Sequence, residues 1–240
     1  VFNASSVYIH NRNGGTIPTA TWNSYSTCNV TGVTNTTPSG IGQSFGNFTW
    51  NCTGQTSNEN FNGNLTTVNG DFKIMSTGTG GDVLRLTNST DLTFSIGGNF
   101  IIEGGDLVFT NNNADVTINV TGDFIQSGGS IDFSTDNAIG ILILNVTGNF
   151  SQSAGFFDFV SGGANTSRTP ALNLGGNFSQ TGSAVVTTTT LDADIINGTI
   201  TFNKNGTQTF SIATQANFDF FNIIIASGST VELNSDITLS

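Results

Sequence analysis

Two aspartates come closest to a catalytic arrangement in this sequence. Asp132 and Asp158 hold the same place in two successive units of a repeating pattern. If the units stack as paired strands, these carboxylates lie about 5 Å apart, a separation that would suit the two carboxylates of a glycoside hydrolase. The equivalent residue one unit earlier is Val108, so no third acid extends the pair. A solvated strand face is the simpler interpretation. Calcium binding by this pair, or by the Asn and Asp residues of the repeated motif described below, is an alternative.

Basic residues are few, and this excludes several function classes. The chain of 240 residues has 16 acidic and 5 basic residues and a formal net charge of −11. The basic residues are scattered: Arg12, Lys73, Arg85, Arg168 and Lys204. A nucleic-acid site needs clustered Lys and Arg, and a polysaccharide lyase needs a Lys, Arg or His base. We therefore expect no nucleic-acid partner and no lyase activity. No cofactor is expected either, with calcium as the one alternative.

The two cysteines offer a covalent link within the chain. Cys28 and Cys52 both lie in its first quarter. A disulfide between them is the simplest interpretation, and it implies an oxidising, extracellular compartment. The alternative is two buried free thiols. Metal binding is not expected, because two cysteines and the single histidine, His10, do not make a zinc site.

The overall composition favours β-structure. Charged residues make up 9% of the chain, against about 25% in typical soluble proteins. Hydrophobic residues make up 36%, and the sequence holds 20 Phe, 30 Gly and only 3 Pro. Ile, Val, Phe and Thr suit pleated strands, whereas a disordered chain has fewer apolar residues. The composition therefore predicts an all-β protein.

One motif recurs along the chain: Gly, then Asn or Asp, then Phe. It occurs at Gly46-Asn47-Phe48, Gly70-Asp71-Phe72, Gly98-Asn99-Phe100, Gly122-Asp123-Phe124, Gly148-Asn149-Phe150 and Gly176-Asn177-Phe178. The interval between successive motif phenylalanines varies little around its mean. Self-similarity at a nearly fixed period, here about 26 residues, is the sequence signature of a repeat architecture.

Each unit holds three short segments in which polar and apolar residues alternate, separated by Gly, Asn and Ser. Three strands and three turns in about 26 residues predict one coil of a parallel β-helix, or β-solenoid. The crossover rule for parallel strands makes the predicted helix right-handed. A propeller is the main competitor, but propeller blades run to about 40 residues or more with four strands.

Stacking of the coils explains the motif. Equivalent residues of successive coils lie above one another at about 4.8 Å. We expect the six phenylalanines to form an inward column: Phe48, Phe72, Phe100, Phe124, Phe150 and Phe178. The preceding residues should form a ladder at the turn through their side-chain amides while tolerating unusual φ and ψ angles: Asn47, Asp71, Asn99, Asp123, Asn149 and Asn177. The glycine before them should supply a backbone conformation denied to other residues.

Three regions of one continuous solenoid follow from this pattern. Residues 1–60 are predicted to form an N-terminal cap and the first coils, with Cys28 and Cys52. Residues 46–196 carry the repeats, and residues 197–240 form further coils of a second repeat type. No apolar run approaches the roughly 20 residues that span a bilayer. We expect a trimmed chain, because it starts at Val1, and more protein stacked beyond Ser240, where a strand pattern ends without a cap.

Further sequence features suggest modification or ligand binding only locally. Asn-X-Ser/Thr acceptor patterns occur in the Asn/Thr-rich turns, among them Asn29, Asn51, Asn88, Asn145 and Asn177. The run Thr187–Thr190 would suit an ice-binding surface, but no Thr-X-Thr array recurs at the equivalent place in other units. Neither N-glycosylation nor ice binding is therefore expected.

The style of the repeats is similar to that of a known class. The Gly-Asn-Phe-Ser-Gln units, IHNRNGGTIPTATW at 9–22, GQSFGNFTWNCTGQT at 42–56 and NFDFFNIIIASGSTVELNSDITLS at 217–240 resemble large repetitive surface proteins of Bacteroidota that a type IX secretion system exports. The resemblance covers essentially the whole chain and is specific for the repeat architecture. It implies an adhesin or stalk at the outer surface, in some members linked to gliding motility.

The function expected from the sequence is structural. We expect a non-enzymatic structural or adhesive segment of a large secreted cell-surface protein. Its partners should be secretion machinery or outer-surface proteins, and surface glycans are a further candidate. The alternative is a carbohydrate-binding or carbohydrate-degrading β-helix, which the carboxylates Asp132 and Asp158 would serve.

Overall fold

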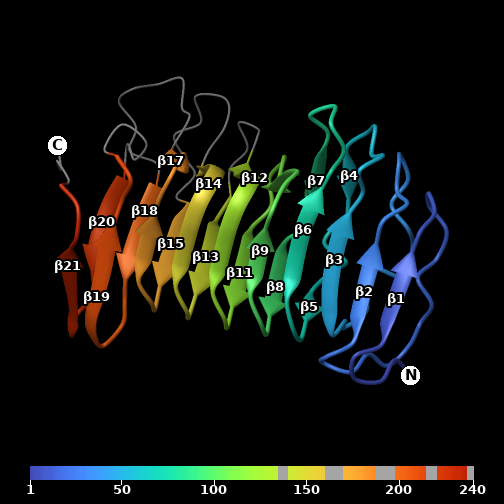
Figure 1. Ribbon diagram of the computed structural model, residues 1–240, viewed down its shortest axis with the longest axis horizontal. Coiled ribbons are helices and arrows are strands. Elements are labelled where there is room, and N and C mark those ends of the chain that lie inside the picture. The colour runs from blue at the N-terminus through green and yellow to red at the C-terminus, as the bar shows by residue number, and fades with distance from the viewer. Residues whose placement is uncertain (135–139, 160–169, 188–197, 215–220, 237–240) are drawn as a thin grey trace.

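The computed structural model describes residues 1–134, 140–159, 170–187, 198–214 and 221–236. In this part of the chain every regular element is a β-strand, and the paired strands run parallel. Successive strands pair with their equivalents one coil away, so the chain forms an elongated stack with its termini at opposite ends (Figure 1). The predicted parallel β-solenoid is confirmed.

The larger sheet holds the first strand segment of each coil. Its hydrogen-bonded order runs β1 (Val7–His10), β2 (Thr27–Val30), β3 (Asn47–Asn51), β6 (Phe72–Ser76), β9 (Phe100–Ile102), β12 (Phe124–Ser134), β14 (Phe150–Asp158), β16 (Phe178–Gln180), β19 (Gly206–Ser211) and β21 (Ser229–Leu233). A second segment branches from this sheet as β4 (Glu59–Asn60), β7 (Val83–Arg85), β10 (Asp106–Thr110) and β17 (Val185–Thr187). In β12 and β14 the two segments are continuous, with register shifts between Gln126 and Ser130.

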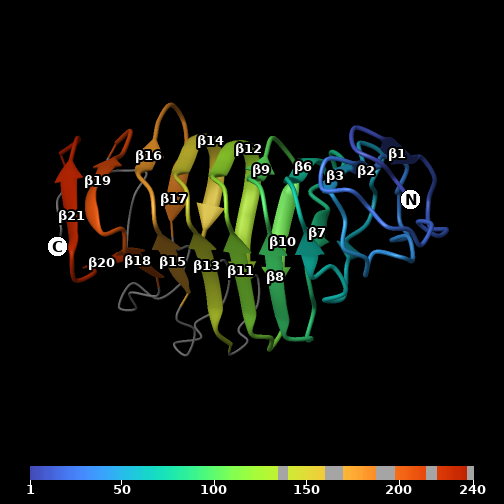
Figure 2. The same ribbon diagram turned by 90° about the horizontal axis from the view of Figure 1, so that it is seen from below.

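The third segment of each coil forms a separate seven-stranded sheet. Its order is β5 (Thr67–Val68), β8 (Leu92–Ile96), β11 (Val116–Val120), β13 (Leu142–Val146), β15 (Ala171–Leu174), β18 (Gly198–Phe202) and β20 (Phe221–Ile225). Figure 2 shows six of them, β8, β11, β13, β15, β18 and β20, following one another along the long axis. Three segments per coil therefore enclose one interior, as the three alternating sequence segments predicted.

The register of the larger sheet places one residue of each coil in a single column. In order the column holds Tyr8, Cys28, Phe48, Phe72, Phe100, Phe124, Phe150, Phe178, Phe210 and Leu233. The six phenylalanines of the motif are fully buried in it. The column thus continues beyond the repeats at both ends.

The two outer regions continue the same stack. In the first region the column positions Tyr8, Cys28 and Phe48 follow one another at a shorter interval than the motif phenylalanines do. At the other end β19 and β21 extend the larger sheet, and β18 and β20 extend the smaller one. Phe210 enters the column although it lacks the preceding Gly-Asn. These regions therefore share the architecture of the repeats.

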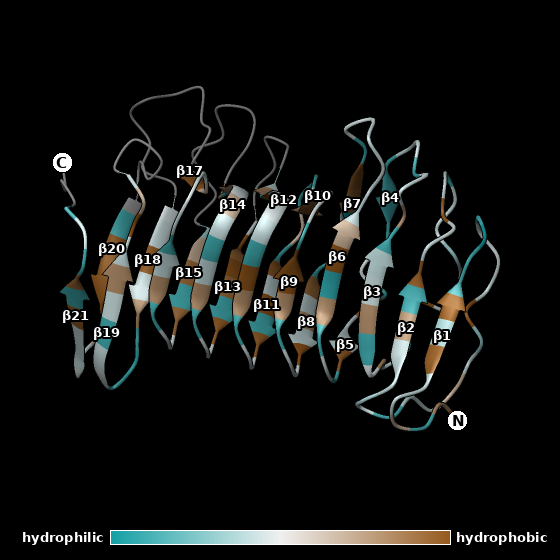
Figure 3. Ribbon diagram, viewed as in Figure 1, coloured by the Kyte–Doolittle hydropathy of each residue, from teal (hydrophilic) through white to brown (hydrophobic). Residues whose placement is uncertain are grey.

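Alternation along each strand separates the interior from the surface. The strands β11 and β13 show a buried residue at every second position, such as Val116, Ile118 and Val120. Figure 3 shows the corresponding alternation of brown and teal bands along the strands. In the described part of the chain, no helix is long and apolar enough to cross a membrane.

Candidate functional site

The turn ladder is built from backbone donors and side-chain oxygens. The Oδ1 atom of Asn47 accepts the backbone N–H of Asp71 at 2.8 Å, and Asp71 Oδ1 accepts that of Asn99 at 2.7 Å. The same bond recurs from Asp123 to Asn99, Asn149 to Asp123, Asn177 to Asn149 and Thr209 to Asn177, at 2.7–2.9 Å. Each coil is thereby bonded to the next at the same point.

This geometry corrects the expected role of the ladder side chains. An oxygen acceptor is what the site requires, so Asn and Asp serve equally. Of the described bonds between ladder side chains, only that of Asn149 uses an amide donor, to Asp123 Oδ1 at 3.2 Å. The expected unusual φ angles are also absent. Among the described non-glycine residues only Ser5 and Asn62 have positive φ.

The motif glycines are needed for space, which corrects the expectation of a special conformation. None of the six has a φ in the left-handed region. A Cβ on Gly70, Gly98, Gly122 or Gly148 would instead collide with the ladder oxygen of the coil before it. A Cβ on Gly148, for example, would also overlap the carbonyl oxygen of Gly122. Each of these four glycines therefore leaves the space that the ladder oxygen of the coil before it occupies.

Carboxylates in the ladder never occupy adjacent coils. The order is Asn47, Asp71, Asn99, Asp123, Asn149 and Asn177. Because neighbouring coils are about 4.8 Å apart, adjacent carboxylates would repel each other. The alternation keeps the acceptor in every coil while separating the charges by two coils.

A second, internal ladder of glutamines was not predicted from the sequence. Gln126, Gln152 and Gln180 are in register and buried. The Gln152 amide donates to Gln126 Oε1 at 3.1 Å and to the backbone oxygen of Val185 at 2.9 Å. Gln126 bonds the Phe156 oxygen in the same way at 2.9 Å. The signal was present in the repeated Phe-X-Gln, where glutamine stands two residues after the column phenylalanine and so on the same inward side.

The disulfide predicted between Cys28 and Cys52 is not formed: both cysteines are free and buried. The register gives the reason. Cys28 lies beside Phe48, so Cys52 lies four residues farther along the neighbouring coil, about 13 Å at about 3.3 Å per residue. A disulfide requires Cα atoms about 4.4–6.8 Å apart. Burial raises the pKa of each thiol to about 12.

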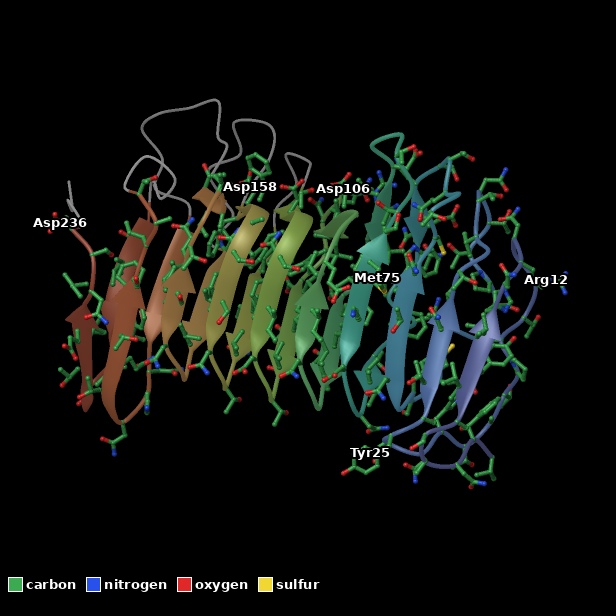
Figure 4. The ribbon with its side chains drawn as sticks, in the orientation of Figure 1. Arg12, Tyr25, Met75, Asp106, Asp158 and Asp236 are labelled. Atoms are coloured by element: carbon green, nitrogen blue, oxygen red, sulfur yellow. The ribbon has the colours of Figure 1, made fainter. Side chains whose placement is uncertain are left out.

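The aspartate pair lies as its spacing predicted, in adjacent coils and in register. Its neighbours in the same column are Val108 on one side and Thr187 on the other. Asp158 is only 6% exposed, so the interpretation of a fully solvated face does not hold at this residue. Figure 4 shows Asp158 at the same edge of the stack as Asp106.

The described groups near the pair include one basic and one acidic side chain. Arg85 belongs to the same column but is separated from Asp132 by Val108. The nearby carboxylate of Asp106 accepts a hydrogen bond from the Ser130 hydroxyl at 2.7 Å. Within the described ranges, no group of three or more His, Cys, Asp or Glu could hold a metal ion. Arg168 and most of Thr187–Thr190 lie outside the described residues.

Among the described residues, two of the surface grooves can hold part of a ligand. The first, about 400 Å³, lies between the corners at 37–42 and 60–64. Much of its polar lining is engaged internally: the Asn60 side chain accepts the Asn62 N–H at 2.7 Å, and the Asn64 amide donates to the Phe61 carbonyl at 2.9 Å. The second, about 270 Å³, lies on the smaller sheet along Asn145, Asn173 and Asn203.

No protein-family model, no curated protein and no solved structure matches this chain.

Proposed function

We propose that this chain is a non-enzymatic structural or adhesive segment of a large, secreted bacterial cell-surface protein. The observation that carries the proposal is the continuous column of the larger sheet, which is fully buried from Cys28 to Phe210. A column of this kind fills the interior mainly with aromatic rings. It joins every coil to its neighbours, as a stiff spacer requires.

The surface chemistry supports the same role. Polar positions are occupied mainly by Asn, Thr and Ser, and the single ion pair found among the described residues joins Lys73 and Glu103 at 2.6 Å. Charged groups at such exposed positions contribute little to stability. Cohesion therefore depends on stacking and on hydrogen-bonded ladders that are mostly uncharged, and salt screens neither of these strongly.

The route to the surface and the partners follow from the resemblance of the repeats. Large repetitive surface proteins of Bacteroidota are exported by a type IX secretion system. We propose the same export route, an extracellular location, and partners among secretion components or outer-surface proteins for this chain.

Protease treatment of intact cells of the source organism tests the proposal. We expect peptides of this chain to be released from intact cells and identified by mass spectrometry, while a cytoplasmic marker protein stays protected. Release of the chain only after cell lysis would contradict the surface location.

A carbohydrate-active solenoid is the second candidate, and two observations favour it. Asp132 and Asp158 are in register, and Phe156 beside them exposes 57% of its surface. A reducing-sugar assay on a panel of polysaccharides separates the candidates. The structural role predicts no hydrolysis. If the chain hydrolyses a polysaccharide and Asp132→Asn abolishes the activity, the chain is a carbohydrate-degrading enzyme instead.

A further inference from the structure

The smaller sheet carries an asparagine ladder on its outer face. Asn119, Asn145 and Asn173 are in register and half-buried. The Asn145 amide donates to Asn119 Oδ1 at 2.8 Å, and the Asn173 amide donates to Asn145 Oδ1 at 2.8 Å. Both donors point toward the N-terminal end of the stack. The ladder stops at Asn173, because Thr201 stands at the next position and no described amide donates to Asn173 Oδ1.

A notch opens beside the end of this ladder. Thr147, Gly175 and Asn203 directly follow the strands β13, β15 and β18 in three successive coils. The Gly175 N–H donates to the Val146 carbonyl of the coil before it. Gly175 has no side chain, and a Cβ there would press on the carbonyl oxygen of Thr147. The packing of the coils therefore keeps the notch open, and its volume is about 270 Å³.

Part of the polar lining of the notch is free of hydrogen bonds within the fold, although Asn145 and the Asn173 amide are bonded in the ladder. Asn203 and Thr147 are exposed, and neither side chain has a hydrogen bond within the described residues. Together with Asn173 Oδ1 they offer an acceptor, an amide and a hydroxyl at one place. In the larger groove the Asn60 and Asn64 side chains already bond the backbone. The smaller groove is thus the better prepared to bind a ligand.

We propose that this notch binds one unit of a neutral, hydroxyl-rich polymer, that is, an uncharged polysaccharide. Its six lining residues, Asn145, Val146, Thr147, Asn173, Gly175 and Asn203, carry no charge. A charged ligand would find no opposite charge among these lining residues to offset its desolvation. Amide and hydroxyl groups both donate and accept hydrogen bonds, which matches the hydroxyls of a sugar.

A polymer fits the notch better than a peptide does. Asn119, Asn145 and Asn173 repeat at the coil spacing of about 4.8 Å, so one chain could meet several amides along the stack. An extended peptide binds by pairing with an exposed strand edge, and the strand β15 beside the notch is already paired on both sides. This inference rests on the proposed adhesive function, because it names the surface that would adhere.

Biolayer interferometry with the whole chain immobilised tests the inference. The probes are cellohexaose, chitohexaose and mannohexaose, with heparin as the anionic comparison. We expect at least one neutral hexasaccharide to bind and heparin not to bind. Asn203→Ala and Thr147→Val should each lower the affinity for the neutral probe about tenfold, which is the effect of one lost hydrogen bond in a binding site. Asn64→Ala, in the other groove, should leave the affinity unchanged.

Two outcomes would overturn the inference: no neutral probe binds at millimolar concentration, or binding is unaffected by both notch substitutions. Circular dichroism of each variant checks that the stack is folded. We expect both variants to fold, because the substituted side chains are exposed. If the chain reaches the cell surface but binds none of the three neutral probes, polysaccharide binding at the notch is refuted and the proposed structural role stands. A chain found only inside cells would refute the proposed role itself.

Discussion

At the scale of single residues, a column phenylalanine contacts rings in the coils before and after its own. The Phe124 ring lies 5.4 Å from that of Phe100, 4.7 Å from Phe150 and 5.4 Å from Phe157, measured between centroids. Phe156, one residue away from Phe157, points outward and is 57% exposed. The two phenylalanines Phe124 and Phe156 therefore form a matched pair, one internal and one external.

We predict that Phe124→Ala lowers the free energy of unfolding by about 3–5 kcal/mol, because a buried aromatic site is emptied. Phe156→Ala should cost less than about 1 kcal/mol. Urea unfolding followed by circular dichroism measures both. Similar losses in the two variants would contradict the assignment of the inner column.

Glycine in the motif gives a second prediction at this scale. Gly148→Ala should lower the free energy of unfolding by about 1–3 kcal/mol, because the new Cβ meets Asp123 Oδ1 and backbone of the neighbouring coil. Gly54→Ala is the control, since its Cβ would meet only the Thr34 methyl group at an ordinary 3.7 Å. Equal thermal midpoints for the two variants would argue against a steric requirement.

The cysteines give a prediction with a defined pH dependence. Burial raises the pKa of Cys28 and Cys52 from 9.0 to about 12, so both thiols stay protonated in the fold while the unfolded chain loses these protons. Their stabilising contribution is full below pH 9 and falls as the pH rises toward 12. Between pH 9 and pH 10, each thiol should lower the free energy of unfolding by about 1 kcal/mol.

Comparison of the parent with the Cys28→Ala/Cys52→Ala double variant isolates this effect, because other titrating groups are common to both. The parent should lose more stability than the variant between pH 9 and pH 10. Both thiols should react with a thiol reagent only after unfolding. If the parent chain shows no free thiol after unfolding without reductant, the two cysteines are bonded to each other and the assignment of free thiols is wrong.

At the scale of elements, the turn ladder joins each coil to the next through an acceptor and separates its charges. Asn99 lies between Asp71 and Asp123, and its Oδ1 accepts the Asp123 N–H. Asn177 lies between Asn149 and Thr209 and accepts the Thr209 N–H. Substitution by Asp keeps the acceptor at either position but places a carboxylate between two others only at position 99.

We therefore predict that Asn99→Asp lowers the free energy of unfolding by about 1–2 kcal/mol at low salt, and that 1 M salt recovers part of the loss. Asn177→Asp should change stability by less than about 0.5 kcal/mol. Denaturation at two ionic strengths measures the difference. If Asn177→Asp is as harmful as Asn99→Asp, charge separation does not explain the alternation.

The repeat period made the fold predictable from the sequence. The positions of individual residues relative to the neighbouring coil depended on the strand register, which the period did not give. The Gly-Asn-Phe spacing identified the coils because equivalent residues must stack. It could not place Cys52, since the first coils are shorter than the repeats that follow them. Phe210 was missed because its interval from Phe178 is longer than any between the motif phenylalanines, and because the preceding Gly-Asn is absent. The notch at Gly175 depends on contacts between coils that no single segment reveals.

At the scale of the whole molecule, each coil contacts only its neighbours, so the stack should respond to load coil by coil. Both sheets extend along the same axis (Figures 1 and 2). A structural role at a cell surface requires that this stack resist extension until a coil is released as a unit.

Single-molecule optical tweezers, with handles at the two ends of the chain, measure that property directly. Releasing one coil of about 26 residues frees about 90 Å of chain at about 3.5 Å per residue. We predict discrete extension steps of about 90 Å or of small multiples, with Phe124→Ala lowering the force of the steps and Phe156→Ala leaving it unchanged. Smooth extension at low force, without steps, would contradict the stacked, load-resisting solenoid.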